Sequence, residues 1–297
     1  MNSLTSDKAL GVVVNLFATF ERKAISYCQW KSNQHLDAGL SGNTDIDLLV
    51  QLNDSESCIH ILIENNFKKI HNNKKTTIHG IEHWLGFDHD TGKLIHIHLH
   101  FEIIIGGRKF KNHKLPIANI FLQNCNIYKG IKIPSPEKEL LILILRVTLK
   151  ADYKTILRAL TNKSHHPIDH NSENELRWLL SKYNRYKFHN VIKESKLKID
   201  KTLFDTFINQ FENKELSGLT LFCKKIRVLK HLRPHRIVKG VKLYKKIVFS
   251  YLIEMKPFSK FLRKEKKKLY SNRTFFAVVG ADGAGKTRLA KDLKKWL

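Results

Sequence analysis

The sequence predicts an α+β protein with a mixed sheet and helices first, a helical region next, and the start of an α/β unit at the end. Three observations along its 297 residues support this order. Strand-like runs of apolar residues are concentrated before residue 134, whereas helical spacing dominates after it. A glycine-rich loop then lies between a strand-like and a helix-like segment close to the C-terminus.

The first domain, residues 1–134, opens with a helix. Apolar residues at helical spacing predict this helix over 7–22 and a second one over 53–66. Asn53 followed by Glu56 matches a capping box, in which two side chains satisfy free backbone groups at the start of a helix. We therefore expect both helices to pack their apolar faces on a sheet.

The strands of this domain alternate with the helices along the chain. Short strands are expected over 25–30 and 45–51, and two long strands over 76–87 and 93–105. The turn at 88–92, with the sequence Asp-His-Asp-Thr-Gly, joins the long strands. The segment is therefore expected to form a mixed or antiparallel sheet.

The helical region begins at Ser135-Pro136-Glu137, where serine caps, proline occupies the first turn and the acid favours the positive end of the helix. Amphipathic helices follow. We divide them into a helical domain, 135–220, and a basic helical connector, 221–273. A new strand is expected from residue 274, so the last segment is 274–297.

Positive charge is the main feature of the composition. The chain holds 53 Lys and Arg against 27 acidic residues, a net charge of +26, which favours anionic partners. In the connector 221–273 the acids are Glu254 and Glu265, and basic residues interleave with apolar ones. Such a helix can lie on an anionic membrane, bind nucleic acid, or pack its apolar stripe on a neighbouring domain. No nucleic-acid-binding motif accompanies the charge, so the membrane is favoured over nucleic acid.

Targeting signals and metal-binding cysteine pairs are not evident in the sequence. The N-terminus has no basic segment followed by an apolar stretch, and the apolar runs are too short to span a bilayer. The cysteines are far apart, without a C-x-x-C pair, as in reduced proteins. We expect a cytoplasmic protein, with the connector as a place for peripheral contact with the inner face of the membrane.

A phosphate-binding loop follows the strand predicted over 275–279. The sequence of residues 280–287 fits G-x-x-x-x-G-K-[ST], and a helix is expected after it. Its glycines let backbone N–H groups surround phosphate oxygens, the lysine reaches the β- and γ-phosphates of ATP or another NTP, and the threonine ligates Mg²⁺. The predicted nucleotide-binding residues of this loop are Gly280, Asp282, Gly283, Gly285, Lys286 and Thr287.

The Asp282-Gly283 pair within this loop resembles the thymidylate kinase-like group of nucleoside monophosphate kinases, over residues 275–297. A complete domain of this kind needs a multi-stranded parallel sheet. The sequence ends about ten residues after Thr287, so we expect only the opening of a truncated P-loop domain, without kinase activity of its own.

Asp45 and Asp47 form a second constellation, in the strand-like run Asp-Ile-Asp-Leu-Leu-Val. Alternate residues of a strand share a face, so these carboxylates are expected to project together. Their repulsion is relieved by a divalent cation, which can also carry a triphosphate. The pair therefore predicts an Mg²⁺ site for phosphoryl or nucleotidyl transfer.

With Lys31 and Ser32 before it, this constellation resembles the nucleotidyltransferase superfamily of polymerase-β-like enzymes over roughly residues 25–105. The resemblance implies that Ser32 binds the triphosphate and that Asp45 and Asp47 are the first two metal-binding carboxylates. Lys31, adjacent, is expected to contact phosphate. The sequence departs from the family at two points: Lys31 replaces a glycine, and no third acid is evident.

A row of histidines lies where the third acid is expected. His96, His98, His100 and Glu102 alternate along one strand and so share a face. One reading is a solvated sheet face, and the other is that a histidine or Glu102 takes the place of the third carboxylate. Neutral imidazoles favour Zn or Fe over Mg, so a site that uses them would differ from an ordinary magnesium site.

The order of these parts resembles bacterial chains in which a divergent nucleotidyltransferase-like domain is fused to a thymidylate kinase-like domain. The resemblance implies a transferase that uses an NTP and Mg²⁺, acts on an unknown acceptor and serves surface-polysaccharide metabolism. His96 and His98 would complete its catalytic site with Asp45 and Asp47. Two alternatives stay open: a catalytically degenerate module that docks a nucleotide kinase at an anionic membrane, and a truncated remnant without function.

Overall fold

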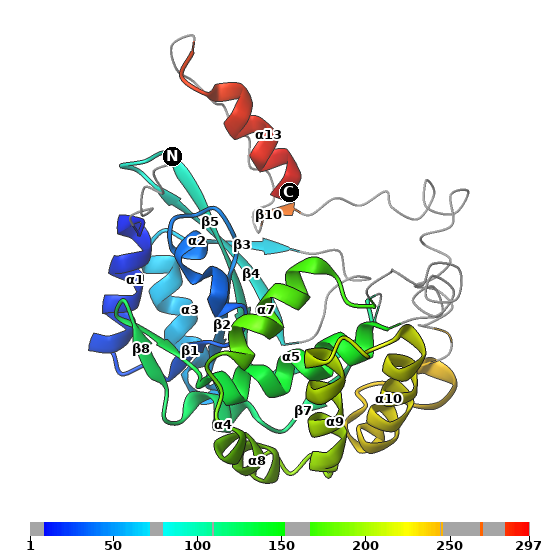
Figure 1. The fold of residues 1–297 in the computed structure, drawn as a ribbon. Helices are drawn as coiled ribbons and strands as arrows, with labels where there is room; N and C mark the ends of the chain where they lie inside the picture. The colour runs from blue at the N-terminus through cyan, green and yellow to red at the C-terminus, as the bar shows by residue number, and fades with distance from the viewer. Residues whose placement is uncertain are drawn as a thin grey trace.

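The computed structural model describes residues 9–71, 80–108, 110–151, 167–243, 245, 268–269 and 283–296. Within them helices and strands are mixed, and the predicted α+β class is confirmed (Figure 1). Strands predominate before residue 134 and helices after it, as the apolar spacing of the sequence indicates.

The main sheet is mixed, also as expected. Its strand order is β1-β2-β5-β4-β3-β10. The pair β2 and β5 is parallel, whereas the other neighbours in this sheet are antiparallel. The strand bounds are Tyr27–Gln29 (β1), Ile46–Val50 (β2), Lys68–His71 (β3), Ile81–Asp88 (β4), Lys93–His100 (β5) and Lys268–Leu269 (β10).

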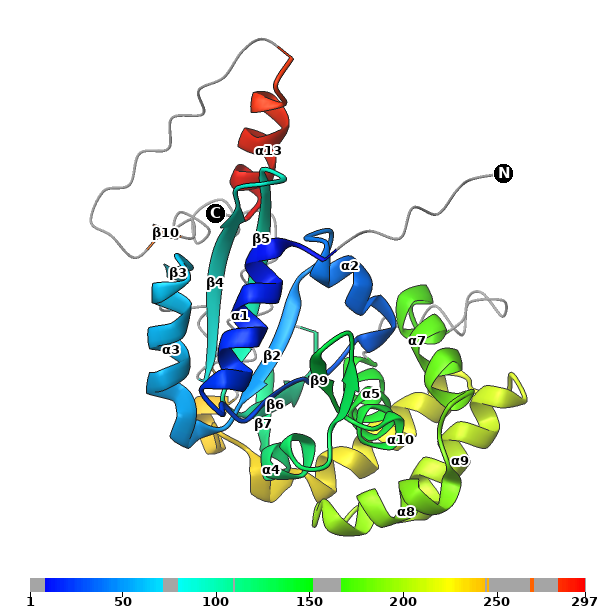
Figure 2. The ribbon, with the colours of Figure 1, turned by 90° about the vertical axis from the view of Figure 1, so that its left-hand side faces the viewer.

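Helices α1 (Gly11–Arg22) and α3 (Ser55–Glu64) lie side by side over one face of this sheet (Figure 2). Apolar residues at alternate positions of β2 and β5 face these helices and form a fully buried core with them. The opposite face therefore receives the intervening residues of the same strands, which include the aspartates and histidines.

The start of α3 differs from the predicted capping box. A 3₁₀ turn, η2 (Leu52–Asp54), precedes the helix, and Asp54 rather than Asn53 occupies the N-cap position. The Asp54 carboxylate accepts a hydrogen bond from the backbone N–H of Ser26 at 2.8 Å. Asp54 thus fixes the chain at the entry to β1 instead of closing the helix.

The long strand expected over 93–105 is divided in two. The chain bends at Phe101 and Glu102, and the next strand, β6 (Ile103–Gly106), pairs with β7 (Lys111–Leu115) in a separate sheet. Helix α4 (Ala118–Leu122) and a hairpin of β8 (Asn126–Tyr128) and β9 (Ile131–Ile133) follow. Because of the bend, residues after His100 leave the main sheet.

Helix α5 (Pro136–Lys150) begins at Ser135-Pro136 as predicted and lies at the centre of the helical part. Its leucines and isoleucines are almost fully buried, and they share one apolar core with Trp30 of the sheet domain and Phe204 of α9. This core therefore continues across residue 134 from the sheet into the helices. The helices around α5 are α7 (His170–Leu180), α8 (Arg185–Glu194), α9 (Lys201–Glu212) and α10 (Gly218–His231).

After α10, the 3₁₀ turn η3 (Arg233–His235) leads to residues held against β7. The side chain of Asn112 accepts a hydrogen bond from the N–H of Val238 and donates one to its carbonyl oxygen. Further on, β10 pairs with β3. The residues of β10 lie in the connector 221–273, for which the sequence predicts helix. No helix among the described residues has the length and apolar character needed to cross a membrane.

Candidate functional site

Asp45 and Asp47 project from the start of β2 to the same face of the sheet, as the alternation of the strand predicts. Asp47 is buried on β2, whereas Asp45, one residue before the strand, keeps 42% of its side chain exposed. Both carboxylates contact His98, at 3.6 Å from Asp45 Oδ2 and 3.2 Å from Asp47 Oδ1. The two acids therefore meet at one point on the surface of the sheet.

The parallel pairing of β2 with β5 brings the histidines to these acids. In its register Asp47 lies directly beside His98, 51 positions further along the chain. His96 Nδ1 lies 3.0 Å from Asp45 Oδ1. The structure thus brings together all four residues that the sequence predicts as catalytic, Asp45, Asp47, His96 and His98, and His98 contacts both carboxylates.

Lys31 approaches the site from the loop after β1. Its Nζ lies 2.7 Å from Asp47 Oδ1, and both side chains are largely buried. Ser32, the next residue, adopts a left-handed backbone conformation with φ 60°, which turns the chain sharply into η1 (Asn33–His35). Lys31 therefore forms an ion pair with a carboxylate of the site, and its phosphate contact stays a prediction.

The surroundings keep both carboxylates ionised. Burial opposes the ionisation of Asp47, but the charge of Lys31 and the nearby imidazoles of His100 and His98 hold its pKa well below the usual value. Burial also opposes the ionisation of Asp45, and the hydrogen bond and charge of His96 lower its pKa. Both acids are thus ready to bind a cation without first losing a proton.

His100 and Glu102 are the remaining members of the predicted row. His100 Nε2 lies 3.6 Å from Asp47 Oδ1, so this residue also adjoins the site, whereas Glu102 does not lie on the strand. His100 is buried with its ring edge-on to Trp30 at 5.2 Å between centroids, and burial lowers its pKa to about 4. Glu102 lies in the bend after β5, outside the sheet, and forms an ion pair with Lys114. The expectation that Glu102 could supply the third carboxylate is therefore wrong, because the bend removes it from the strand.

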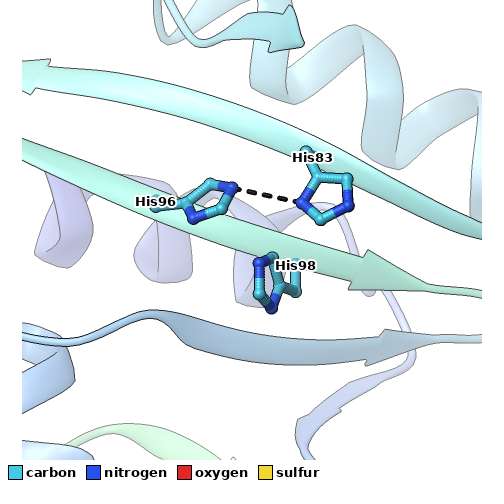
Figure 3. A group of neighbouring side chains, drawn as sticks. All are labelled: His83, His96 and His98. Carbon is cyan, nitrogen blue, oxygen red and sulfur yellow. Dashed lines mark hydrogen bonds between the residues drawn. The ribbon is translucent and has the colours of Figure 1, made fainter. Parts of the chain in front are cut away.

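His83 also lies at the site, although the sequence gives no indication of a role for it. It lies on β4 directly across from His98, and its Nδ1 is 3.2 Å from His96 Nε2. Figure 3 shows the rings of His83, His96 and His98 turned toward one another on β4 and β5. The turn of the hairpin fixes this arrangement: once Asp88 pairs with Lys93, the register places His83 opposite His98.

The residues of the predicted phosphate-binding loop are described only in part. Gly280 and Asp282 lie outside the described residues. Gly283 and Gly285 have positive φ angles of 87° and 75°, as a turn into a helix requires, and α13 (Lys286–Trp296) begins directly after them. Thr287 is exposed in the first turn of this helix.

A cavity of about 330 Å³ adjoins the loop at Asn33. Asn33, Tyr128, Glu139 and Trp178 contribute to its lining. The Glu139 carboxylate accepts hydrogen bonds from the Asn33 backbone N–H and Nδ2, both at 2.9 Å. Burial nevertheless dominates and raises the pKa of Glu139 to about 7.

This raised pKa predicts how the Glu139→Gln variant responds to pH. Because the folded state holds a proton that the unfolded chain releases near pH 4.5, Glu139 makes wild-type stability fall as pH rises from 4.5 to 7. Glutamine removes this titration. Relative to the wild type, the variant should gain about 3 kcal/mol of unfolding free energy between pH 4.5 and pH 8, as measured by urea denaturation.

Glu212→Gln is the matched control, since Glu212 is exposed at the end of α9. The unfolding free energy of the Glu212→Gln variant should follow that of the wild type at every pH. Parallel curves for Glu139→Gln and the wild type would show that Glu139 titrates alike in the folded and unfolded states.

No protein-family model, no curated protein and no solved structure matches this chain. Its function is therefore inferred from the geometry of the site.

Proposed function

We propose that the chain is a nucleotidyltransferase-like enzyme that transfers a nucleotidyl group from an NTP to a hydroxyl acceptor, with Mg²⁺ bound by Asp45 and Asp47. The observation that carries the proposal is the meeting of two ionised carboxylates with Lys31 and His98 at one point of the sheet. A divalent cation between carboxylates and phosphates stabilises the charge that develops during transfer.

In this proposal each side chain has one task. Asp45, the more exposed carboxylate, and Asp47, the more buried one, would together hold the cation that accompanies the nucleotide. With a cation beside Asp47, Lys31 would be able to contact the phosphates together with Ser32. The acceptor oxygen attacks the α-phosphorus, the bond to the bridging oxygen breaks, and pyrophosphate leaves. His98, between both carboxylates, receives the acceptor proton.

The phosphate-binding loop supports a nucleotide as the ligand class. Gly283 and Gly285 lead with positive φ angles into α13, the geometry in which backbone N–H groups face an anion at the start of a helix. Lys286 and Thr287 are the side chains that would contact phosphate and Mg²⁺ in that segment. This element gives the chain a second proposed place for ATP or another NTP.

The test compares the wild type with an Asp45→Asn/Asp47→Asn double variant. Pyrophosphate release from each common ribonucleoside triphosphate is measured with Mg²⁺ and a panel of sugars and sugar phosphates as acceptors. The double variant should lose at least about 100-fold in rate, since a catalytic metal contributes several kcal/mol. Asp90→Asn, in the exposed turn after β4, is the matched control and should keep wild-type activity.

A second candidate is a binding module that docks at an anionic membrane surface. The observation that favours it is a group of exposed apolar residues among the basic residues of α10 and the segment after it: Leu219, Ile226, Ile237 and Val241. Such a surface is typical of interfacial binding. Failure of the wild type to bind Mg²⁺–NTP in calorimetry, together with binding to phosphatidylserine vesicles, would support this module over the transferase.

A further inference from the structure

We propose that His83, His96 and His98 bind one transition-metal ion of the Zn²⁺ type, and that Asp45 and Asp47 orient two of these histidines. This proposal goes beyond the transferase function, since it needs neither nucleotide nor acceptor, and in the zinc-bound state His98 is a ligand and not the proton acceptor. It also adds His83 to the site.

One pair of nitrogen atoms already has the spacing that such an ion requires, and the third ring lies close to both. His83 Nδ1 and His96 Nε2 lie 3.2 Å apart, and one ligand atom from each of the three rings lies within 4.8 Å of the others. Two nitrogens bound to one tetrahedral Zn²⁺ at ~2.0–2.1 Å are separated by ~3.3 Å. Only small side-chain rotations are therefore needed to bring the three rings to a common ion.

Each of the two carboxylates contacts the Nδ1 atom of one histidine ring. His96 Nδ1 is 3.0 Å from Asp45 Oδ1, and His98 Nδ1 is 3.2 Å from Asp47 Oδ1. An ionised carboxylate only accepts hydrogen bonds, so it keeps the proton on Nδ1 and leaves the lone pair on Nε2. This carboxylate–histidine pairing recurs in protein metal sites, where it fixes the ring and increases its basicity.

Charge and access also suit a bound cation. Asp45 Oδ2 lies 3.6 Å from His98 Nε2, so negative charge is close to the place of the ion. The side chain of His96 is 7% exposed and that of His98 24%, which shields the site and still lets an ion enter. Three protein ligands leave a fourth tetrahedral position for water or substrate. Imidazole nitrogens prefer Zn²⁺ to Mg²⁺, and this donor set therefore differs from the proposed magnesium site.

The backbone holds the three histidines in place. His83 and His98 are cross-strand partners in the antiparallel hairpin of β4 and β5. His96 lies two residues before His98 on β5 and therefore on the same face of the sheet. A paired hairpin keeps its register, so the ligands do not depend on a loop for their positions.

The experiment uses the full chain without a histidine tag, stripped of metal with a chelator and titrated with Zn²⁺ in a calorimeter. We expect one strong site per chain, weakened at least about 100-fold in His83→Ala and in His96→Ala. Asp45→Asn should weaken it by about 10–100-fold, the usual effect of removing a carboxylate behind a ligating histidine. His89→Ala, in the exposed turn of the same hairpin, is the matched control and should bind as the wild type does.

Equal affinity of the wild type and a His83→Gln/His96→Gln variant would overturn the proposal. Glutamine keeps a polar side chain of similar reach, and circular dichroism shows whether each variant is folded. Co²⁺ gives a second readout, because tetrahedral coordination produces visible absorption bands that the His83→Gln variant should lack. Zinc binding without nucleotidyl transfer would leave this proposal intact and reject the transferase, whereas transfer by a chain that binds no zinc would do the reverse.

Discussion

Lys31→Met should lower the unfolding free energy by about 3–5 kcal/mol, because it leaves the carboxylate of Asp47 buried without its cation. The Nζ–Oδ1 distance of 2.7 Å and side-chain exposures of 15% and 10% make this a largely buried pair. His98 and His100 also contact Asp47, but these contacts replace only part of the interaction with Lys31. Guanidinium denaturation at pH 7 measures the loss.

A double variant separates the pair from its parts. Lys31→Met/Asp47→Leu removes both charges, so most of the lost stability should return, as apolar residues in place of a buried ion pair are often neutral or better. The thermodynamic cycle of the two single variants and the double variant then gives the coupling energy. Lys129→Met is the matched control: its pair with Asp37 has the same 2.7 Å distance but is about half exposed, and should matter little. Equal effects of Lys31→Met and Lys129→Met would contradict the prediction.

Phe204→Ala should cost about 3–5 kcal/mol, the usual effect of removing a fully buried aromatic ring. Phe204 lies on the apolar face of α9, has no exposed surface and meets the ring of Phe188 edge-on, with 5.8 Å between centroids. The cavity that alanine leaves is surrounded by helices that α5 holds in place. Phe204→Leu, which keeps most of the apolar volume, should lose clearly less.

This variant also tests whether sheet and helices unfold together. Trp30 of the sheet domain and Phe204 belong to the same apolar core, so one cooperative transition is expected by far-ultraviolet circular dichroism and by tryptophan fluorescence. The two probes should give the same midpoint in the wild type and in Phe204→Ala. A separate early transition in the variant would show that the helices form an independent folding unit.

Local sequence patterns predicted the strands of the site and the faces of their side chains. The alternation of Asp45 and Asp47, and of His96 and His98, follows from the two-residue period of a strand. The pairing of β2 with β5 was not accessible, because it joins segments far apart in the sequence with no local signal for parallel order. The contact of His98 with both carboxylates therefore required the structure.

The positions of His83 and Lys31 were not evident from the sequence, for different reasons. His83 is a single histidine in a strand of mixed composition, and its place at the site depends on the register of the hairpin, which the predicted turn could have supplied. The ion pair of Lys31 with Asp47 depends on a loop in which the next residue, Ser32, has a positive φ. Such a left-handed serine is uncommon and leaves no trace in the sequence.

The parallel pairing of β2 with β5 has a consequence for the order in which the site assembles during folding. His83, His96 and His98 lie within one hairpin, which forms in ~1–10 μs in isolated peptides. Asp47 must instead come from 51 positions away, and closing that longer loop costs entropy before any contact compensates for it. We therefore expect the site to assemble during folding from the histidines to the aspartates, the reverse of their order along the chain.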